Sequence, residues 1–252
     1  MLPEAAARDC VRASDGVRGV TSIPPAYPKV LDEDATLRLV LAGRSLARYG
    51  DGEFKVCGGA GAKAQRFDSR LTRRLREILH ESGACLVGIP NARSKTPKSE
   101  LWQKQARCGV RFLKKGREYG SAFVTRPDSA PWIHRPEYWE AVQSLWVGQD
   151  VTLVRGSGKS LTAEDLNVTG ARRVTEIVGP PQHAWGVYDE LMERIGRPDR
   201  ALLCLGPAAT AMAVDLCAKG VHAIDLGHIG MFLRKVRRGE PLRVTDADKV
   251  AV

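Results

Sequence analysis

The sequence predicts an α/β protein with a Rossmann-like, three-layer α/β/α sandwich built on a mostly parallel sheet. Short apolar runs typical of strands alternate with helical segments from residue 29 onward, a rhythm that indicates βαβ units. The chain has 252 residues, of which 43% are hydrophobic, enough for one large domain with a buried core. We expect one folded domain over residues 29–240, a loosely attached polar arm before it (1–28) and a tail after it (241–252).

The first half of the chain supplies two helix–strand pairs. Residues 31–43 (LDEDATLRLVLAG) place acids ahead of an apolar-periodic segment and predict a helix; SLARYG (45–50) follows as a strand. FDSRLTRRLREILHE (67–81) repeats apolar residues at helical spacing, and GACLVGIP (83–90) is a short buried strand. The basic segment that follows predicts a loop and a helix, and then a strand at SAFVTRP (121–127).

The second half continues the alternation. A helix is expected at 137–149 and another at 183–196, with strands at DVTLVRG (150–156) and RRVTEIVGPP (172–181). Residues 200–228 then predict a strand, a tight turn, a helix and a last strand.

Four of the expected strands end in polar or glycine-rich segments: RYGDGE (48–53), RGSGKS (155–160), GPAAT (206–210) and DLGH (225–228). The carboxyl ends of parallel strands lie at one edge of a sheet, and ligands of such folds bind there. We therefore expect these four segments to converge on one site.

Asp51 and Glu53 are the strongest candidates for chemistry. In an extended segment, residues two apart point to the same face, so both carboxylates could hold one hard cation, Mn²⁺ or Mg²⁺. Gly50 lets a phosphate or a metal approach the backbone closely. An exposed acidic turn is the alternative, but Arg48 favours a functional site because an arginine beside two carboxylates is paired or positions an anion.

The segment after 150–155 resembles a phosphate-binding loop only in part. A P-loop needs a glycine at position 153, where this chain has leucine, so a P-loop NTPase is excluded. The segment is either a diphosphate-binding turn or a solvated loop. Its candidate contacts are Arg155, Gly156, Lys159 and Ser160.

The last two strand ends offer a helix start and an acid–imidazole pair. Backbone N–H groups at a helix start bind phosphate well, which makes Gly206, Pro207, Ala208 and Thr210 candidates; small residues there can equally serve close packing. Asp225 and His228 stand three residues apart on the same expected edge as Asp51 and Glu53.

The formal charge of +10 attracts phosphate-bearing partners. The basic clusters lack the interleaved aromatic residues of single-strand binders and no zinc-finger or RNP motif is present, so nucleic acid is not an expected partner. No apolar run approaches the roughly 18 residues of a membrane span. We expect a cytoplasmic protein, with either peripheral contact to an anionic membrane or merely a solvated helix end at the cluster Arg234, Lys235, Arg237 and Arg238.

Together these motifs resemble the GT-D glycosyltransferases, a family first described as a bacterial domain of unknown function. The resemblance runs from about residue 35 to about residue 235. The motifs that support the resemblance are ARYGDGE (47–53), VTRPD (124–128), LVRGSGKS (153–160), IVGPPQHAWGVYDEL (177–191) and LGPAATAMAVDLCAKGVHAIDLGHIG (205–230).

The resemblance implies a metal-dependent enzyme that moves a sugar from a nucleotide sugar, such as a UDP-sugar, to a glycan, glycoprotein or lipid-linked acceptor. Asp51 and Glu53 would be the metal ligands. Arg48, the 155–160 loop and the 206–210 turn would contact the nucleotide or its diphosphate. Asp225 is the first candidate for the base that activates the acceptor, and His228 is the second.

Two other classes use some of the same features. A metal-dependent nucleotide or phosphate-ester hydrolase would employ the same acids and basic loops with water as the acceptor. A basic nucleic-acid-binding protein is suggested by the net charge alone.

Overall fold

The computed structural model describes residues 23–156 and 159–244. They form a seven-stranded sheet in the order β3-β2-β1-β7-β6-β4-β5, in which every strand pair is parallel. The strands are β1 (Leu46–Arg48), β2 (Leu86–Ile89), β3 (Gly120–Ser121), β4 (Asp150–Arg155), β5 (Arg173–Val178), β6 (Arg200–Cys204) and β7 (His222–Asp225). The predicted parallel sheet is confirmed.

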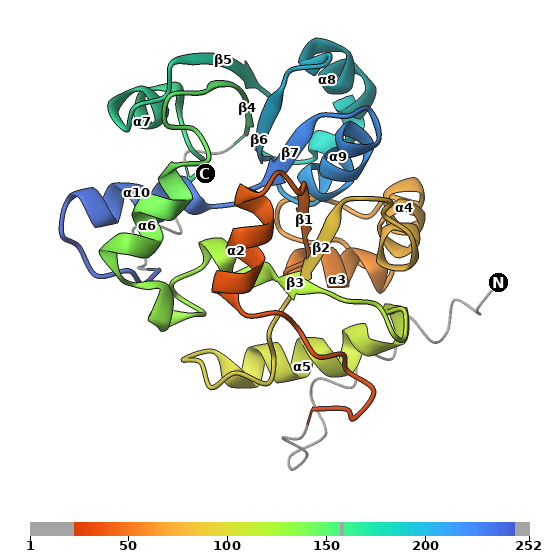
Figure 1. Cartoon of the computed structure of the whole chain (residues 1–252). Coiled ribbons are helices and arrows are strands. Elements are labelled where there is room, and N and C mark those ends of the chain that lie inside the picture. The colour runs from red at the N-terminus through yellow and green to blue at the C-terminus, as the bar shows by residue number, and fades with distance from the viewer. Residues whose placement is uncertain (1–22, 157–158, 245–252) are drawn as a thin grey trace.

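Helices cover both faces of this sheet. In Figure 1, α3, α4 and α9 group on one side and α2, α6 and α10 on the other, which confirms the three-layer α/β/α sandwich. The α-helices are α2 (Glu33–Leu41), α3 (Asp51–Cys57), α4 (Ser69–His80), α5 (Ser99–Gly109), α6 (Pro136–Gln143), α7 (Ala163–Val168), α8 (Tyr188–Ile195), α9 (Pro207–Ala218) and α10 (Ile229–Arg237). Short 3₁₀ turns are η1 (Val110–Phe112), η2 (Ala122–Thr125), η3 (Pro131–Ile133) and η4 (Ala184–Val187).

Local chemistry explains where the helices begin and which face they bury. The Asp68 carboxylate accepts the N–H groups of Arg70 and Leu71 and so caps α4. That helix buries the apolar stripe of its sequence. Helix α9 is buried along almost its whole length because its alanines let it lie close against β1, β6 and β7.

One expected strand is mostly absent. Only Gly120 and Ser121 pair with β2, after which the chain turns into η2. The reason is local: the Ser121 hydroxyl accepts the N–H of Phe123, and this bond favours a turn over a continued strand. The prediction of a strand over 121–127 was therefore wrong.

The ends of the expected domain are described only in part. Of the expected arm, residues 23–28 are described; Tyr27 is buried there and its hydroxyl donates to the Pro90 carbonyl at 2.7 Å. Of the expected tail, residues 241–244 are described, and Leu242 is buried. Among the described residues, no helix has the length and apolar character needed to cross a membrane.

The strand order places a switch point between β1 and β7. From β1 the chain builds outward to β2 and β3, whereas β7, β6, β4 and β5 lie on the other side. In open parallel sheets, the crevice beyond the carboxyl ends at such a point is the usual ligand site. Arg48 ends β1 and Asp225 ends β7, so both lie at this crevice.

Candidate active site

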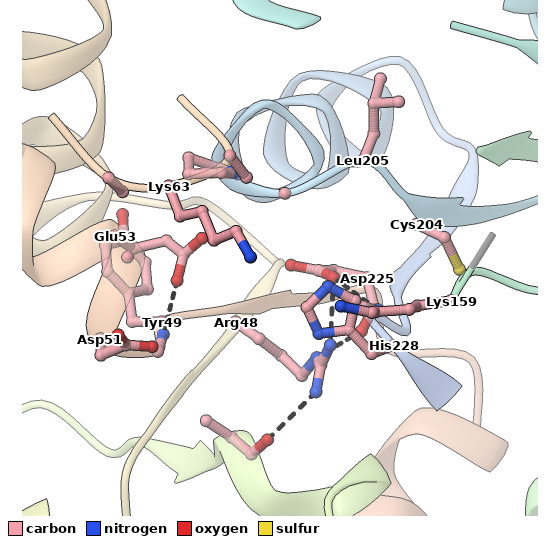
Figure 2. Close-up of a pocket in the computed structure, with 18 of the residues that line it drawn as sticks. Arg48, Tyr49, Asp51, Glu53, Lys63, Lys159, Cys204, Leu205, Asp225 and His228 are labelled. Carbon is pink, nitrogen blue, oxygen red and sulfur yellow. Dashed lines mark hydrogen bonds and ion pairs between the residues drawn. The ribbon is translucent and has the colours of Figure 1, made fainter. Parts of the chain in front are cut away.

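A pocket of about 290 Å³ occupies the crevice at the switch point. The four strand ends expected to converge do converge there, as Figure 2 shows for the labelled side chains. Ten of the predicted site residues line it: Arg48, Gly50, Asp51, Glu53, Gly156, Lys159, Gly206, Pro207, Asp225 and His228.

Asp51 and Glu53 line the pocket, but not in the extended geometry that the sequence suggested. Helix α3 begins at Asp51, with Gly50 as its N-cap. The Glu53 carboxylate turns back to accept the Gly50 N–H at 2.7 Å, and Asp51 pairs with Lys55 at 3.2 Å. A glutamate at the third helical position completes a cap of this kind. The shared-face prediction was wrong because the glycines start a helix instead of extending the strand.

Two buried acids of the pocket, Glu53 and Asp225, have raised pKa values. Burial and, after it, the nearby Asp225 carboxylate raise the pKa of Glu53 to about 7. Burial also raises the pKa of Asp225, although Arg48 opposes the effect. Desolvated carboxylates that face one another favour either a proton or a bound cation.

Arg48 holds the floor of the pocket together. Its Nε donates to the Asp225 carbonyl at 2.6 Å and its Nη2 pairs with the Asp225 carboxylate at 3.3 Å. Its Nη1 donates to the Ala122 carbonyl and to the Thr125 hydroxyl. A Cβ on Gly227 would lie 2.1 Å from Nη2, so the guanidinium is also tightly packed. Its donors therefore join β1, β7 and η2, and the expected contact of Arg48, which also lines the pocket, with a diphosphate stays a prediction.

Four further residues that were predicted to contact the ligand lie behind the pocket wall and do not line the pocket. Arg155 pairs with Glu176 at 2.8 Å, and the Ser160 hydroxyl donates to the Cys204 carbonyl at 2.9 Å. Ala208 is fully buried, as is Thr210, whose hydroxyl donates to the Arg48 carbonyl at 2.9 Å. Their side chains support the wall, and contact of these four residues with a ligand stays a prediction.

His228 stands at the start of α10 and is accessible from the pocket. The protein atoms around its ring desolvate it, and the cations Arg126, Arg48 and Lys159 add to this effect, so the pKa of the imidazole falls to about 4. The ring is therefore neutral at physiological pH.

The structure adds pocket residues that sequence reasoning missed, namely Arg126, Lys63, Trp102 and Phe123. Arg126 comes from the segment VTRPD, whose arginine and aspartate form a two-bond ion pair at 2.8 Å. Burial lowers the pKa of Arg126. The hydrogen bonds and charge of Asp128, together with the charges of Asp51 and Glu53, outweigh burial, so that the pKa is raised. The motif signalled the segment; nothing in the sequence signalled Lys63 or the two aromatic residues.

The C-terminal basic cluster is solvated only in part: Arg237 and Arg238 are exposed, whereas Arg234 and Lys235 are not. Arg234 lies in α10, donates to the Ser160 carbonyl at 3.2 Å and pairs with Asp165. Lys235 is buried and donates to the Arg243 carbonyl at 2.7 Å. These two cations are therefore bonded within the protein, and the expected contact of the cluster with an anionic membrane stays a prediction.

A parallel α/β sheet with carboxylates, cations and a helix start gathered at its switch point defines a class: the α/β enzymes whose ligand site lies beyond the carboxyl ends of the strands. The comparison with known families is more specific. The chain belongs to the glycosyltransferase GT-D fold family, whose model matches residues 46–245.

Curated relatives and solved structures agree with this family. The chain is 30% identical over 220 residues to the probable glycosyl transferase Gly of Streptococcus gordonii, covering 79% of this chain and 32% of that protein. It is 27% identical over 233 residues to glycosyltransferase GlyD of Streptococcus pneumoniae, covering 86% of this chain and 28% of that protein. The chain thus spans about a third of the length of these curated relatives.

Two solved structures share the fold. One, described as the highly conserved domain of unknown function 1792 with a distinct glycosyltransferase fold, is 28% identical, with 87% of this chain and 85% of that chain covered and a TM-score of 0.74. Another, a new glycosyltransferase from Streptococcus sanguinis, is 25% identical, with 84% and 85% covered and a TM-score of 0.73. The predicted GT-D resemblance is confirmed, and the glycosyltransferase class is favoured over the hydrolase and nucleic-acid-binding alternatives.

Proposed function

We propose that this glycosyltransferase takes its sugar from a nucleotide sugar, a UDP-sugar in the first instance, with the help of a divalent metal ion. The observation that carries the proposal is the convergence of two desolvated acids, several cations and the start of α9 in one pocket at the switch point. Cleavage of a sugar–diphosphate bond leaves negative charge on the nucleotide, and such a pocket stabilises that charge as it develops.

The donor set fits a metal that the protein and the substrate share. Within residues 23–156 and 159–244, no three His, Cys, Asp or Glu side chains are grouped so that they could hold an ion by themselves. Mg²⁺ and similar ions are commonly bound by one or two carboxylates together with substrate phosphates. Asp51 and Glu53 would be those carboxylates, and the raised pKa of Glu53 is the strain that a cation would relieve. The ion would neutralise charge on the leaving diphosphate.

The remaining pocket residues divide between the donor and the acceptor. Gly206 (φ 59°) and Pro207 open α9 at the pocket, where helix-start N–H groups favour a phosphate, and Lys159 adds positive charge. On the acceptor side, His228 replaces Asp225 as the first candidate for the base. The Asp225 carboxylate is tied to Arg48 and to the Gly227 N–H, whereas the neutral His228 ring is accessible and can take a proton.

The acceptor is proposed to be a glycan, a glycoprotein or a lipid-linked saccharide. A contact with an anionic membrane would rest on Arg237 and Arg238, whose side chains are 43% and 68% exposed. Each basic residue near such a surface contributes about 1 kcal/mol. Co-sedimentation with anionic and neutral vesicles tests this part, with Arg237→Gln/Arg238→Gln as the variant; binding that the variant retains excludes it.

The experiment for the donor site is a thermal-shift panel of UDP and UDP-sugars with and without Mn²⁺ or Mg²⁺, because ligand binding raises the melting temperature by mass action. The double variant Asp51→Asn/Glu53→Gln should keep its fold and lose the metal-dependent part of the shift. Glu190→Gln, an exposed acid outside the pocket lining, is the matched control. A metal-dependent shift that survives in the double variant would refute the assignment of these two acids.

A further inference from the structure

Two loops that are far apart in the sequence meet at the pocket. Residues 62–64 contribute to its lining from one loop, and Pro181, Gln182 and Ala184 contribute from the other. The first loop is a tight turn, because Ala62 and Gln65 exchange two backbone hydrogen bonds, at 2.7 and 3.1 Å. Lys63 and Ala64 form the tip of this turn.

His183 fastens the two loops together. Its N–H donates to the Ala64 carbonyl at 2.9 Å, and its Nδ1 accepts the Arg66 N–H at 3.0 Å. A third bond joins the Trp185 N–H to the Gln65 side-chain oxygen at 3.3 Å. Nδ1 is therefore the unprotonated ring nitrogen.

The backbone of His183 has an unusual conformation that these bonds stabilise. With φ 61° and ψ 31°, it is the only non-glycine residue with a positive φ among those that the structure describes. A side chain in this left-handed region costs free energy. Glycine would remove that cost but could not accept the Arg66 N–H, so the histidine provides the side-chain bond at the expense of backbone strain.

The fastened turn presents a cation to the pocket. Ala62 lies against Gly52, and Ala64 against Gly206, since a Cβ on either glycine would be 3.7 and 3.5 Å from the respective alanine Cβ. The turn therefore packs on both the acidic segment and the start of α9. Figure 2 shows the Lys63 side chain reaching into the pocket that Glu53 and Asp225 also line.

We propose that the 62–65 turn is a preformed cover of the donor pocket, in which Lys63 binds the diphosphate of the ligand and His183 is the residue that positions it. The identity of the ligand rests on the proposed function; the anion-binding role of Lys63 does not. The Lys63 ammonium group stabilises the negative charge that develops on the leaving diphosphate. Because His183 orders the loop before the ligand arrives, binding does not have to supply the cost of ordering it.

The test of Lys63 uses isothermal calorimetry with UDP and with inorganic diphosphate. Lys63→Met keeps the aliphatic stem and should weaken both ligands about tenfold or more, the usual effect of losing a charge-assisted hydrogen bond. Lys63→Arg should retain most of the affinity. Lys219→Met, an exposed lysine outside this pocket, should match the wild type. Wild-type affinity in Lys63→Met, or a wild-type protein that binds neither probe, overturns the proposal.

The test of His183 uses hydrogen exchange at the Arg66 amide, which needs no ligand. His183→Gly should speed exchange there about tenfold or more and weaken diphosphate binding. His183→Asn should restore both, because asparagine tolerates the left-handed region and its side-chain oxygen can accept the same N–H. Unchanged Arg66 exchange in His183→Gly overturns the positioning role. A wild-type protein that binds diphosphate through Lys63 but transfers no sugar from any nucleotide sugar would instead refute the proposed function alone.

Discussion

Asp128 offers a sharp test of how the pocket wall is held, through the substitution Asp128→Asn. Its side chain is 2% exposed and accepts from Nε and Nη2 of Arg126, both at 2.8 Å, and from Lys98. Asparagine has nearly the same shape but removes the negative charge between two cations. It also turns an N–H₂ group toward one of them.

The magnitude follows from the pKa of the carboxyl. Burial would raise it, but the hydrogen bonds and charges of Arg126 and Lys98 outweigh burial and lower the pKa of Asp128 from 3.8 to about 2. A lowered pKa in the folded state means that the carboxylate stabilises the fold above pH 4 and that this stability is lost as the pH falls toward 2. At 1.36 kcal/mol per pKa unit, the contribution is about 2 kcal/mol. Arg126 and Lys98 are 23% and 33% exposed, so the cost of the substitution should stay below that of breaking a fully buried pair, roughly 3–5 kcal/mol.

Urea denaturation of both proteins from pH 7 to pH 3 measures this contribution. We expect Asp128→Asn to be less stable by about 2 kcal/mol at pH 7, and the difference between the two proteins to shrink by about 1 kcal/mol at pH 3. Asp189→Asn, an exposed aspartate on α8, should show neither effect. A difference that is the same at pH 7 and pH 3, or one below about 0.5 kcal/mol at pH 7, would show that the ion pair does not stabilise the wall.

Three further substitutions test other parts of the structure. Gly230→Ala would place a Cβ 2.3 Å from the Ser160 carbonyl oxygen and should destabilise the fold by about 1–3 kcal/mol or more in urea, whereas Gly186→Ala meets nothing within 4 Å and should be neutral. Ala208→Leu should lower the melting temperature, because the site is fully buried and overpacking costs about 1–3 kcal/mol; an equally stable variant would contradict the packing described. His228→Asn should reduce kcat by roughly 10²–10⁴-fold while UDP affinity is kept, as for the loss of a general base; an unchanged kcat would exclude His228 from that role.

The strand ends were predictable because their signals are local. The runs before Asp51, Gly156, Gly206 and Asp225 are apolar and bounded by glycine or acid, and the parallel sheet brings such ends to one edge. The conformation after β1 was not predictable from spacing alone. The spacing of Asp51 and Glu53 is compatible with an extended segment. In the structure the Glu53 carboxylate instead accepts the Gly50 N–H and caps a helix. The spacing of the two acids does not distinguish these two conformations.

The roles of single side chains depended on partners distant in the sequence. Arg48 forms an ion pair with Asp225, which lies 177 residues later in the sequence. No pattern in a single sequence indicates which arginine forms such a long-range ion pair. Thr210 was chosen for its hydroxyl, yet the close packing of α9 on β1 turns that hydroxyl to the Arg48 carbonyl. Lys63 was missed because its position over the pocket is fixed by a loop 120 residues away, through the Gln65–Trp185 bond.

The floor of the pocket joins segments from opposite ends of the chain. Arg48 bonds directly to residues 74 and 177 positions further along, so none of its partners is a near neighbour in sequence. Contacts of such long range form only when the intervening chain has folded, and they cannot persist in a fragment. A ligand bound on this floor therefore stabilises the native state of the whole domain, and it should slow the exchange of even those amides that open only by global unfolding. A ligand bound at the switch point thus stabilises all segments of the cooperative domain together.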